Sequence, residues 1–122
     1  MSNAVVWVDI PVLDLDRASA FYSAVLGAPV IREVVGEMVF GTLPHLAGTV
    51  GAALSVIPGV SPSAVGPLVY LSVEGRLDAA TLAVVASGGA VLAAKHLIGS
   101  YGYRALILDS EGNRIALHSM AP

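Results

Sequence analysis

The hydrophobic positions along the chain follow the same order twice. An apolar run over residues 5–12 precedes a helical pattern that ends at Gly27, and an apolar run over residues 68–73 precedes a helical pattern over residues 76–87. Asp14 or Asp16 can cap the first helix, because a short carboxylate accepts hydrogen bonds from the free N–H groups at a helix start. Gly27 and the Gly88-Gly89 pair are typical of helix ends.

After each helix the pattern changes to the alternation of apolar and polar residues that is typical of strands. These segments are residues 29–34, 37–43 and 49–57 in the first half and residues 90–94, 101–109 and 113–119 in the second. Each half is therefore predicted to run strand, helix, three strands. We expect an α+β fold in one domain over residues 1–122, with repeat units at about residues 4–57 and 67–120. Residues 58–66, rich in Pro, Gly and Ser, form the linker.

The alternation also predicts which side chains share one face of each strand. In the first strand Trp7 and Asp9 lie opposite the face that packs under the helix, and in the fourth strand Leu54 and Val56 take the helix side and Ser55 the other. The same parity places Tyr70 and His118 on the matching face of the second repeat. If these faces curl around a common space, Asp9, Ser55, Tyr70 and His118 meet in a cup otherwise lined by Trp7, Ala53, Leu68 and Ala116. A mostly apolar pocket with a few polar groups is typical of small-molecule sites.

Composition limits the classes of partner. Hydrophobic residues make up 56% of the 122 residues and charged residues only 12%, so apolar surface is expected at an interface, and we predict a homodimer. The net charge is −3 and the basic residues are scattered singly, which disfavours nucleic acid. The chain has no cysteine, no basic leader and no apolar run of the roughly 20 residues that a membrane span needs. We therefore expect a cytoplasmic protein that does not enter membranes.

Two stretches resemble the vicinal oxygen chelate superfamily, which includes glyoxalase I, bleomycin-resistance proteins and extradiol dioxygenases. They are the opening segment Trp7–Tyr22 followed by Val25-Leu26-Gly27, and the closing segment Leu108–Ser119 with its Asp-x-x-Gly-Asn turn. The resemblance implies two βαβββ repeats that form a half-open, barrel-like sheet with the helices on the outer face, often completed across a two-fold dimer.

The resemblance also places the metal ligands of the superfamily's enzymes on this sequence. The four positions are occupied by Trp7, Ala53, Leu68 and Ala116. None of these side chains is an imidazole or carboxylate, which a divalent metal site of this type requires. We therefore expect no metal cofactor. A shifted site that uses Asp9, His118 and a residue from elsewhere is a weaker alternative, because two protein ligands are too few.

The candidate functions differ in kind. In the first, the protein is an enzyme in which Asp9 and His118 form a metal-free acid and base pair for an isomerase, lyase or ring-opening step, while Tyr70 and Ser55 hold the substrate. In the second, it is a binding or sequestering protein that stacks a largely apolar drug or metabolite on Trp7. A purely structural role is a third option, in which His118 and Asp9 only satisfy local hydrogen bonds.

Other residues are expected to line the cup or to lie outside it. Leu68 and Ala116 are predicted to contact the ligand, and Tyr101 and Tyr103 flank Gly102, where one strand parity puts both rings on the cavity side as a rim. The alternative is that these tyrosines merely pack at a sheet end. His45 and His96 are expected to be surface or rim residues rather than ligands. Lys95 and Arg104 could meet an anionic group of a ligand, but isolated cations are usually solvated, so neither is assigned a role.

Overall fold

The computed structural model describes residues 3–122 and contains the strand–helix–three-strand order twice. The first half consists of β1 (Trp7–Pro11), α1 (Leu15–Leu26), β2 (Ile31–Val35), β3 (Met38–Thr42) and β4 (Gly51–Ser55). The second half consists of β5 (Val69–Ser72), α2 (Leu77–Ala86), β6 (Ala90–Leu97), a 3-10 turn (Gly99–Tyr101), β7 (Tyr103–Leu108) and β8 (Arg114–Ser119). The predicted α+β class and the two βαβββ repeats are confirmed.

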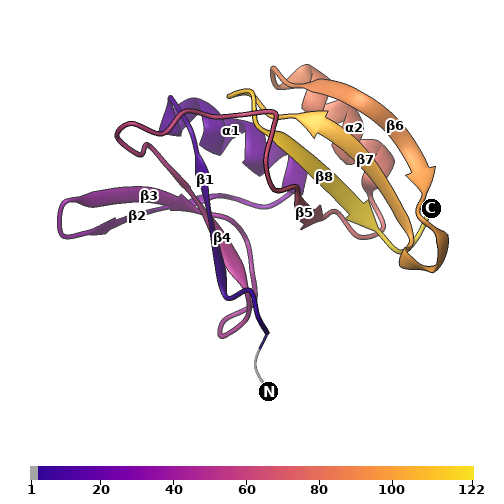
Figure 1. Ribbon diagram of the computed structural model, residues 1–122, viewed down its shortest axis with the longest axis horizontal. Coiled ribbons are helices and arrows are strands. Elements are labelled where there is room, and N and C mark those ends of the chain that lie inside the picture. Colours follow the sequence, from indigo (N-terminus) through magenta and orange to yellow (C-terminus); the bar gives the residue numbers. More distant parts are fainter. Residues whose placement is uncertain (1–2) are drawn as a thin grey trace.

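The strands form two separate four-stranded sheets (Figure 1). Sheet 1 has the order β1-β4-β3-β2, and sheet 2 has the equivalent order β5-β8-β7-β6. In each sheet the first strand pairs in parallel with the last strand of its repeat, and the other pairings are antiparallel. Neither sheet closes on itself, and the helices cover only one face of each sheet. The face away from the helices is therefore open.

Local sequence signals set the helix ends. The Asp14 carboxylate accepts a hydrogen bond from the backbone N–H of Arg17 at 3.0 Å, so Asp14 rather than Asp16 caps α1. Gly27 follows in the left-handed conformation with φ of 70°, which glycine adopts without the strain that a Cβ would bring. The sequence pattern placed both helices within about two residues of their observed ends.

One hydrophobic core lies between the two helices and the helix-facing sides of both sheets. Helices α1 and α2 pack against each other, so the two repeats share this core rather than having one each (Figure 1). Its largest fully buried side chains come from both repeats and include Phe21, Tyr22, Leu54, Leu77, Ile107, Ile115 and Leu117. Because both repeats contribute to this core, the two sheets have a fixed relative position, and the core does not cover their open faces.

A polar network ties the β7–β8 turn to the start of α1. The Glu111 carboxylate accepts hydrogen bonds from the backbone N–H groups of Leu13 and Asp14 and forms an ion pair with Arg17 at 2.7 Å. Beside it the buried Tyr22 hydroxyl donates to Asp109 at 2.5 Å, and the Asn113 amide donates to Asp109 and to the Pro11 carbonyl. The closing turn therefore fastens the second repeat to the first.

The observed strand ends change one predicted orientation. Sheet pairing of β4 stops at Ser55, so Val56 lies beyond the strand and is 57% exposed instead of facing the helix. Within residues 3–122, no helix is both long and apolar enough to cross a bilayer.

Candidate functional site

The open face of sheet 1 bears a cavity of about 650 Å³, named here the sheet-1 cavity. The pairing register places Trp7 beside Gly51 on this face, Asp9 beside Ala53, and Ser55 beside Phe40. Apolar groups dominate the lining, and the only carboxylates in it belong to Asp9 and Glu37. The lining residues are Trp7, Asp9, Glu37, Met38, Val39, Phe40, Ala53, Ser55, Val56, Ile57 and Pro58.

Trp7 is the largest exposed apolar group of this cavity, with 41% of its surface accessible. Its indole N–H donates to the Asp9 carboxylate at 3.2 Å, and its ring meets the edge of His45 with centroids 5.6 Å apart. A Cβ on Gly51 would approach the indole to 2.8 Å, so the glycine at this register position makes room for the ring. The indole is therefore held in place while one part of it faces the cavity.

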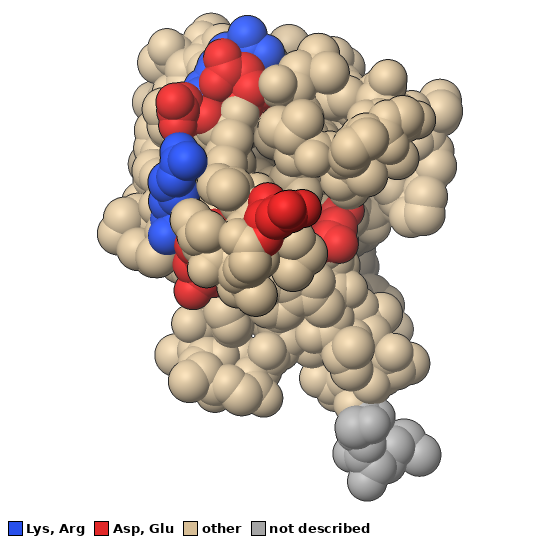
Figure 2. Space-filling model, turned by 90° about the vertical axis from the view of Figure 1, so that its left-hand side faces the viewer, with Lys and Arg blue, Asp and Glu red and all other residues tan. Residues whose placement is uncertain are grey.

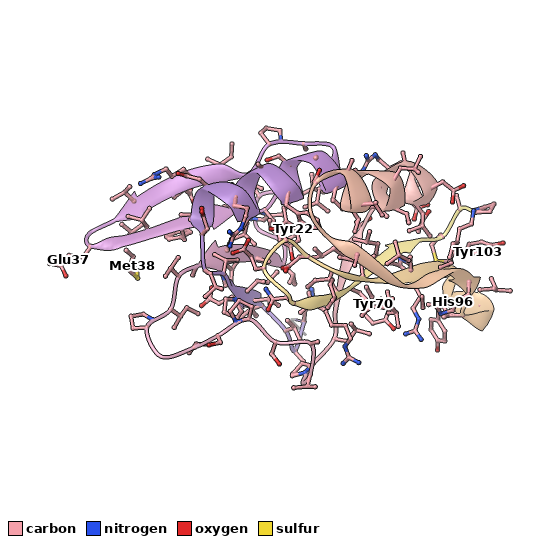
Figure 3. The ribbon with its side chains drawn as sticks, turned by 90° about the horizontal axis from the view of Figure 1, so that it is seen from above. Tyr22, Glu37, Met38, Tyr70, His96 and Tyr103 are labelled. Carbon is pink, nitrogen blue, oxygen red and sulfur yellow. The ribbon has the colours of Figure 1, made fainter. Side chains whose placement is uncertain are left out.

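The open face of sheet 2 bears a row of polar side chains across its strands. The register aligns His96 of β6 with Arg104 of β7, Arg104 with His118 of β8, and His118 with Ser72 of β5. Tyr70 lies one pleat along on the same face, and its ring centroid is 6.4 Å from that of His118. Tyr70 and His96 both lie on the side of the ribbon away from the helices (Figure 3).

Hydrogen bonds fix the orientation of this row. The Arg104 guanidinium donates through Nε to His96 Nε2 at 3.0 Å and through Nη1 to the Tyr70 hydroxyl. His96 Nδ1 bonds the Ala94 carbonyl at 2.9 Å, so Nδ1 carries the proton and Nε2 accepts. His118 Nε2 donates to the Tyr101 carbonyl at 2.5 Å, which leaves Nδ1 as the ring nitrogen available to a ligand.

The four polar residues predicted to converge lie in two pairs. Asp9 and Ser55 share the sheet-1 cavity with Trp7, whereas Tyr70 and His118 lie together on sheet 2. The two sheets do not curl toward each other within one chain (Figure 1). One chain therefore presents two half-sites rather than the single cup that the parity predicts.

The rim prediction is wrong for Tyr103. Its ring packs against the hydrophobic core, because Tyr103 has the parity of the buried Ala105 and Ile107. Tyr101 lies outside the strand in the 3-10 turn and is 75% exposed, and its carbonyl accepts a hydrogen bond from His118. The break between the turn and β7 gives these two tyrosines different surroundings despite their spacing.

The positions that would hold a metal in the superfamily's enzymes offer no donor atoms here. Trp7 lies on the open face of β1, Ala53 pairs with Asp9 in the register, and the buried Ala116 pairs with Tyr70. Leu68 immediately precedes β5 and is half-buried. An indole ring and three alkyl groups cannot coordinate a divalent cation, so the residues present do not fit the metal.

A carboxylate supports the C-terminal end of β8 near His118. Glu74 accepts hydrogen bonds from the backbone N–H groups of Met120 and Ala121 and from the Ser119 hydroxyl. The backbone bonds, first from Met120 and then from Ala121, hold the pKa of Glu74 below its ordinary value. The segment that follows His118 is thereby tied to the loop between β5 and α2.

Arg104 and His96 belong to the sheet-2 face, whereas the sequence pattern placed His96 at the surface or rim and assigned Arg104 no role. Alternation along β7 was the available signal, because Arg104 has the parity opposite to the buried Ala105 and Ile107. His96 could not be placed in the same way, because the β6–β7 pairing shifts register between Val91 and His96. An irregular strand breaks the simple odd-and-even rule.

Comparison with protein families gives one match over most of the chain. The model described as Glyoxalase/Bleomycin resistance protein/Dioxygenase superfamily matches residues 4–117. No curated protein matches the sequence.

Solved structures share the fold at low sequence identity. A glyoxalase/bleomycin resistance protein from Albidiferax ferrireducens aligns with a TM-score of 0.75 and 19% identity over 96% of this chain and 98% of that chain. A glyoxalase/bleomycin resistance protein/dioxygenase family enzyme from Burkholderia phytofirmans aligns with a TM-score of 0.70 and 19% identity over 93% of this chain and 96% of that chain. An E144Q glyoxalase I mutant from Zea mays aligns with a TM-score of 0.70 and 21% identity over 94% of this chain but only 46% of that chain.

Proposed function

Because this chain belongs to the glyoxalase/bleomycin resistance protein/dioxygenase superfamily, we propose that it is a metal-independent member that binds a small, largely apolar organic molecule. The observation that carries this proposal is the exposed part of Trp7 in the apolar sheet-1 cavity. A large flat ring of this kind offers a stacking surface, while Asp9 and Ser55 beside it can orient polar atoms of a ligand. Metal independence rests on the donor chemistry of Trp7, Ala53, Leu68 and Ala116.

A second copy of the chain completes the cup in this proposal. The β2–β3 hairpin exposes apolar side chains on both of its faces, among them Val34, Val35 and Met38 at 55–63% exposure. Apolar surface of this extent on a monomer marks an interface. A two-fold arrangement places sheet 1 of one copy opposite sheet 2 of the other, so that each cup contains one Trp7–Asp9 half-site and one Tyr70–His118 half-site.

The second candidate function is acid–base catalysis in the same cup. The bond from His118 Nε2 to the Tyr101 carbonyl supports it, because the proton on Nε2 leaves Nδ1 as an unprotonated, basic nitrogen. In this function His118 Nδ1 removes a proton from one substrate atom and, as the imidazolium, returns the same proton to a neighbouring atom, while Tyr70 holds a substrate oxygen. The Asp9 carboxylate of the other copy stabilises the positive charge that His118 carries between the two transfers.

Binding is tested with the neutral, apolar dye N-phenyl-1-naphthylamine, whose emission rises in an apolar site. Trp7→Ala is expected to weaken dye binding about tenfold or more, because the stacking surface is lost. Leu82→Ala serves as the control, since Leu82 is 75% exposed on α2 away from the open faces. Equal dye affinity of the wild type and Trp7→Ala would refute the proposal.

The two functions are separated by three variants assayed on compounds that the wild-type protein binds. In the catalytic function, His118→Ala and Asp9→Asn abolish turnover and leave affinity within about threefold. In the binding function, no compound is turned over. Trp7→Ala then lowers the affinity most, and His118→Ala and Asp9→Asn change the affinity little.

A further inference from the structure

Arg104 differs from the other basic side chains of the chain in its partners. Within residues 3–122, ion pairs join Arg17 to Glu111, Arg32 to Asp16, and Lys95 to Asp78. Arg76 and Arg114 instead donate to backbone carbonyls, of Val25 and of Gly66. Arg104 donates only to two neutral side chains, His96 and Tyr70, and no carboxylate of the described chain forms an ion pair with it.

The Arg104 guanidinium is held in place rather than free in solvent. The residue is half-buried, and its Nε and Nη1 each donate a hydrogen bond to a side chain. Its guanidinium carbon, Cζ, lies 5.8 Å from the centre of the Tyr70 ring. His96 is itself fixed through the Ala94 carbonyl. A guanidinium has more N–H donors than these two bonds use, and Nη2 keeps both of its own for an external acceptor.

The surroundings favour an anion at this point. The row across sheet 2 consists of His96, Arg104, His118 and Ser72, none of which is acidic. Arg104 Nη2 and the Ser72 hydroxyl supply its donors to a ligand, because the N–H groups of His96 and His118 already bond backbone carbonyls. A fixed guanidinium that has no carboxylate partner can accept an anion, and its planar fork matches the geometry of a carboxylate. By contrast, both charged groups that line the sheet-1 cavity, Asp9 and Glu37, are acidic.

We infer that Arg104, positioned by His96 and Tyr70, forms an oxyanion-binding subsite and that the small molecule bound by this protein carries a carboxylate. The inference rests on the proposed cup, in which the apolar part of the molecule contacts Trp7 while its carboxylate lies against Arg104 and near His118. The ligand class is therefore an organic acid with an apolar, preferably aromatic, body. Phosphate shares the oxyanion chemistry and is distinguished by experiment.

The probes are benzoate, its neutral analogue benzamide, and inorganic phosphate, titrated into the full chain by NMR with ¹⁵N-labelled backbone and arginine Nε groups. Benzoate is expected to shift the Arg104 Nε resonance and amides of β7 and β8, and benzamide is expected to bind at least about tenfold more weakly. Phosphate that shifts the same resonances more strongly than benzoate would keep the oxyanion subsite but refute the assignment to a carboxylate.

Arg104→Gln removes the charge and Arg104→Lys keeps it without the planar fork. The expected loss of benzoate affinity is about tenfold or more for Arg104→Gln and intermediate for Arg104→Lys. Arg32→Gln is the matched control, because it makes the same change at an exposed arginine of sheet 1 and should leave benzoate affinity unchanged. Thermal unfolding of each variant shows whether it is folded. If the Arg104→Gln protein is unfolded, the Arg104→Lys protein still tests the inference.

Two results would overturn the inference. One is equal binding of benzoate and benzamide that does not depend on Arg104. The other is conversion of the Arg104→Gln and Arg104→Lys proteins to monomers, which would mean that Arg104 pairs with a carboxylate of the second copy. Dye binding by the wild-type protein and its dependence on Trp7 are measured separately, so the proposed function can survive either result. Conversely, Arg104-dependent benzoate binding with no role for Trp7 would refute the proposed function and leave the subsite.

Discussion

At the scale of single residues, Glu111 combines burial with several donors. Burial of its side chain raises the pKa, but the Arg17 guanidinium, the Asp14 N–H, the Ser110 hydroxyl and the Leu13 N–H together lower it from 4.5 to about 2. A lowered folded-state pKa means that the ionised carboxylate stabilises the fold. This stabilisation is complete above the unfolded-state pKa and is lost as the pH falls from about 5 toward 2.

We predict that Glu111→Gln lowers the free energy of unfolding at pH 7 by about 2–3 kcal/mol, because Arg17 and two backbone N–H groups lose their charged acceptor. The variant should also lose part of the decrease in stability between pH 5 and pH 2. Urea unfolding at a series of pH values measures both effects. Glu37→Gln, at an exposed turn residue, is the control with unchanged stability, and a Glu111→Gln protein with the wild-type pH profile would contradict the explanation.

Tyr22 shows how the same turn depends on a buried partner. Burial, and then the negative charge of Asp109, raise the pKa of Tyr22 well above its ordinary value, so its hydroxyl stays protonated and donates to Asp109. The helical pattern in the sequence did not indicate that the Tyr22 hydroxyl completes a network with the Asp-x-x-Gly-Asn turn, because Asp109 lies 87 residues away in the sequence.

At the scale of elements, the end of α2 depends on two neighbouring glycines for different reasons. Gly88 has φ of 95° with open space around it, so its requirement is conformational. Gly89 has no such φ, but a Cβ there would lie 2.4 Å from the Leu108 carbonyl oxygen and 2.8 Å from Phe21. The chain at Gly89 therefore passes too close to β7 and α1 for any side chain.

We predict that Gly89→Ala lowers the free energy of unfolding by about 3 kcal/mol, because backbone and core atoms must move to accept the Cβ. Gly88→Ala should cost about 1 kcal/mol, from backbone strain alone. Chemical denaturation of both variants tests this order. A Gly88→Ala protein that is the less stable of the two would show that strain, rather than close packing, limits this helix end.

At the scale of the whole molecule, the proposed dimer depends on the two open faces and on the exposed apolar side chains of the β2–β3 hairpin. We predict that the wild-type protein sediments as a dimer and that Met38→Glu, which places a charge on the exposed hairpin, yields a folded monomer at micromolar concentration. Sedimentation velocity measures the change, with Leu82→Glu on the exposed side of α2 as the control. A wild-type monomer, or a dimer insensitive to Met38→Glu, would contradict the composite cup.

Charged groups are few on the side of the molecule that bears the hairpin. Figure 2 shows acidic groups in the middle of this side and acidic and basic groups together at its top and along one edge. The tip of the hairpin, with Glu37 and Met38, lies far from Tyr70 and His96 in one chain (Figure 3). In the proposed dimer, the Trp7–Asp9 half-site of one copy therefore meets the Tyr70–His118 half-site of the other copy.

The sequence alone determined the order of the elements, because the period of hydrophobic positions reports directly whether a segment buries one side as a helix or as a strand. It also determined the parity that puts Trp7 and Asp9 on one face and Tyr70 and His118 on another, and the lack of donor atoms at the metal positions of the superfamily. These properties are local, so they can be predicted without knowledge of how the segments pack.

Only the tertiary structure decided which of these residues lie together. Packing of α1 against α2 into one core turns the two open faces apart within a chain, which separates Asp9 from His118. The irregular pairing of β6 brings His96 to Arg104, and the 3-10 turn separates the surroundings of Tyr101 and Tyr103. Such contacts depend on the relative position of distant segments, which the alternation of side chains along a single strand does not encode.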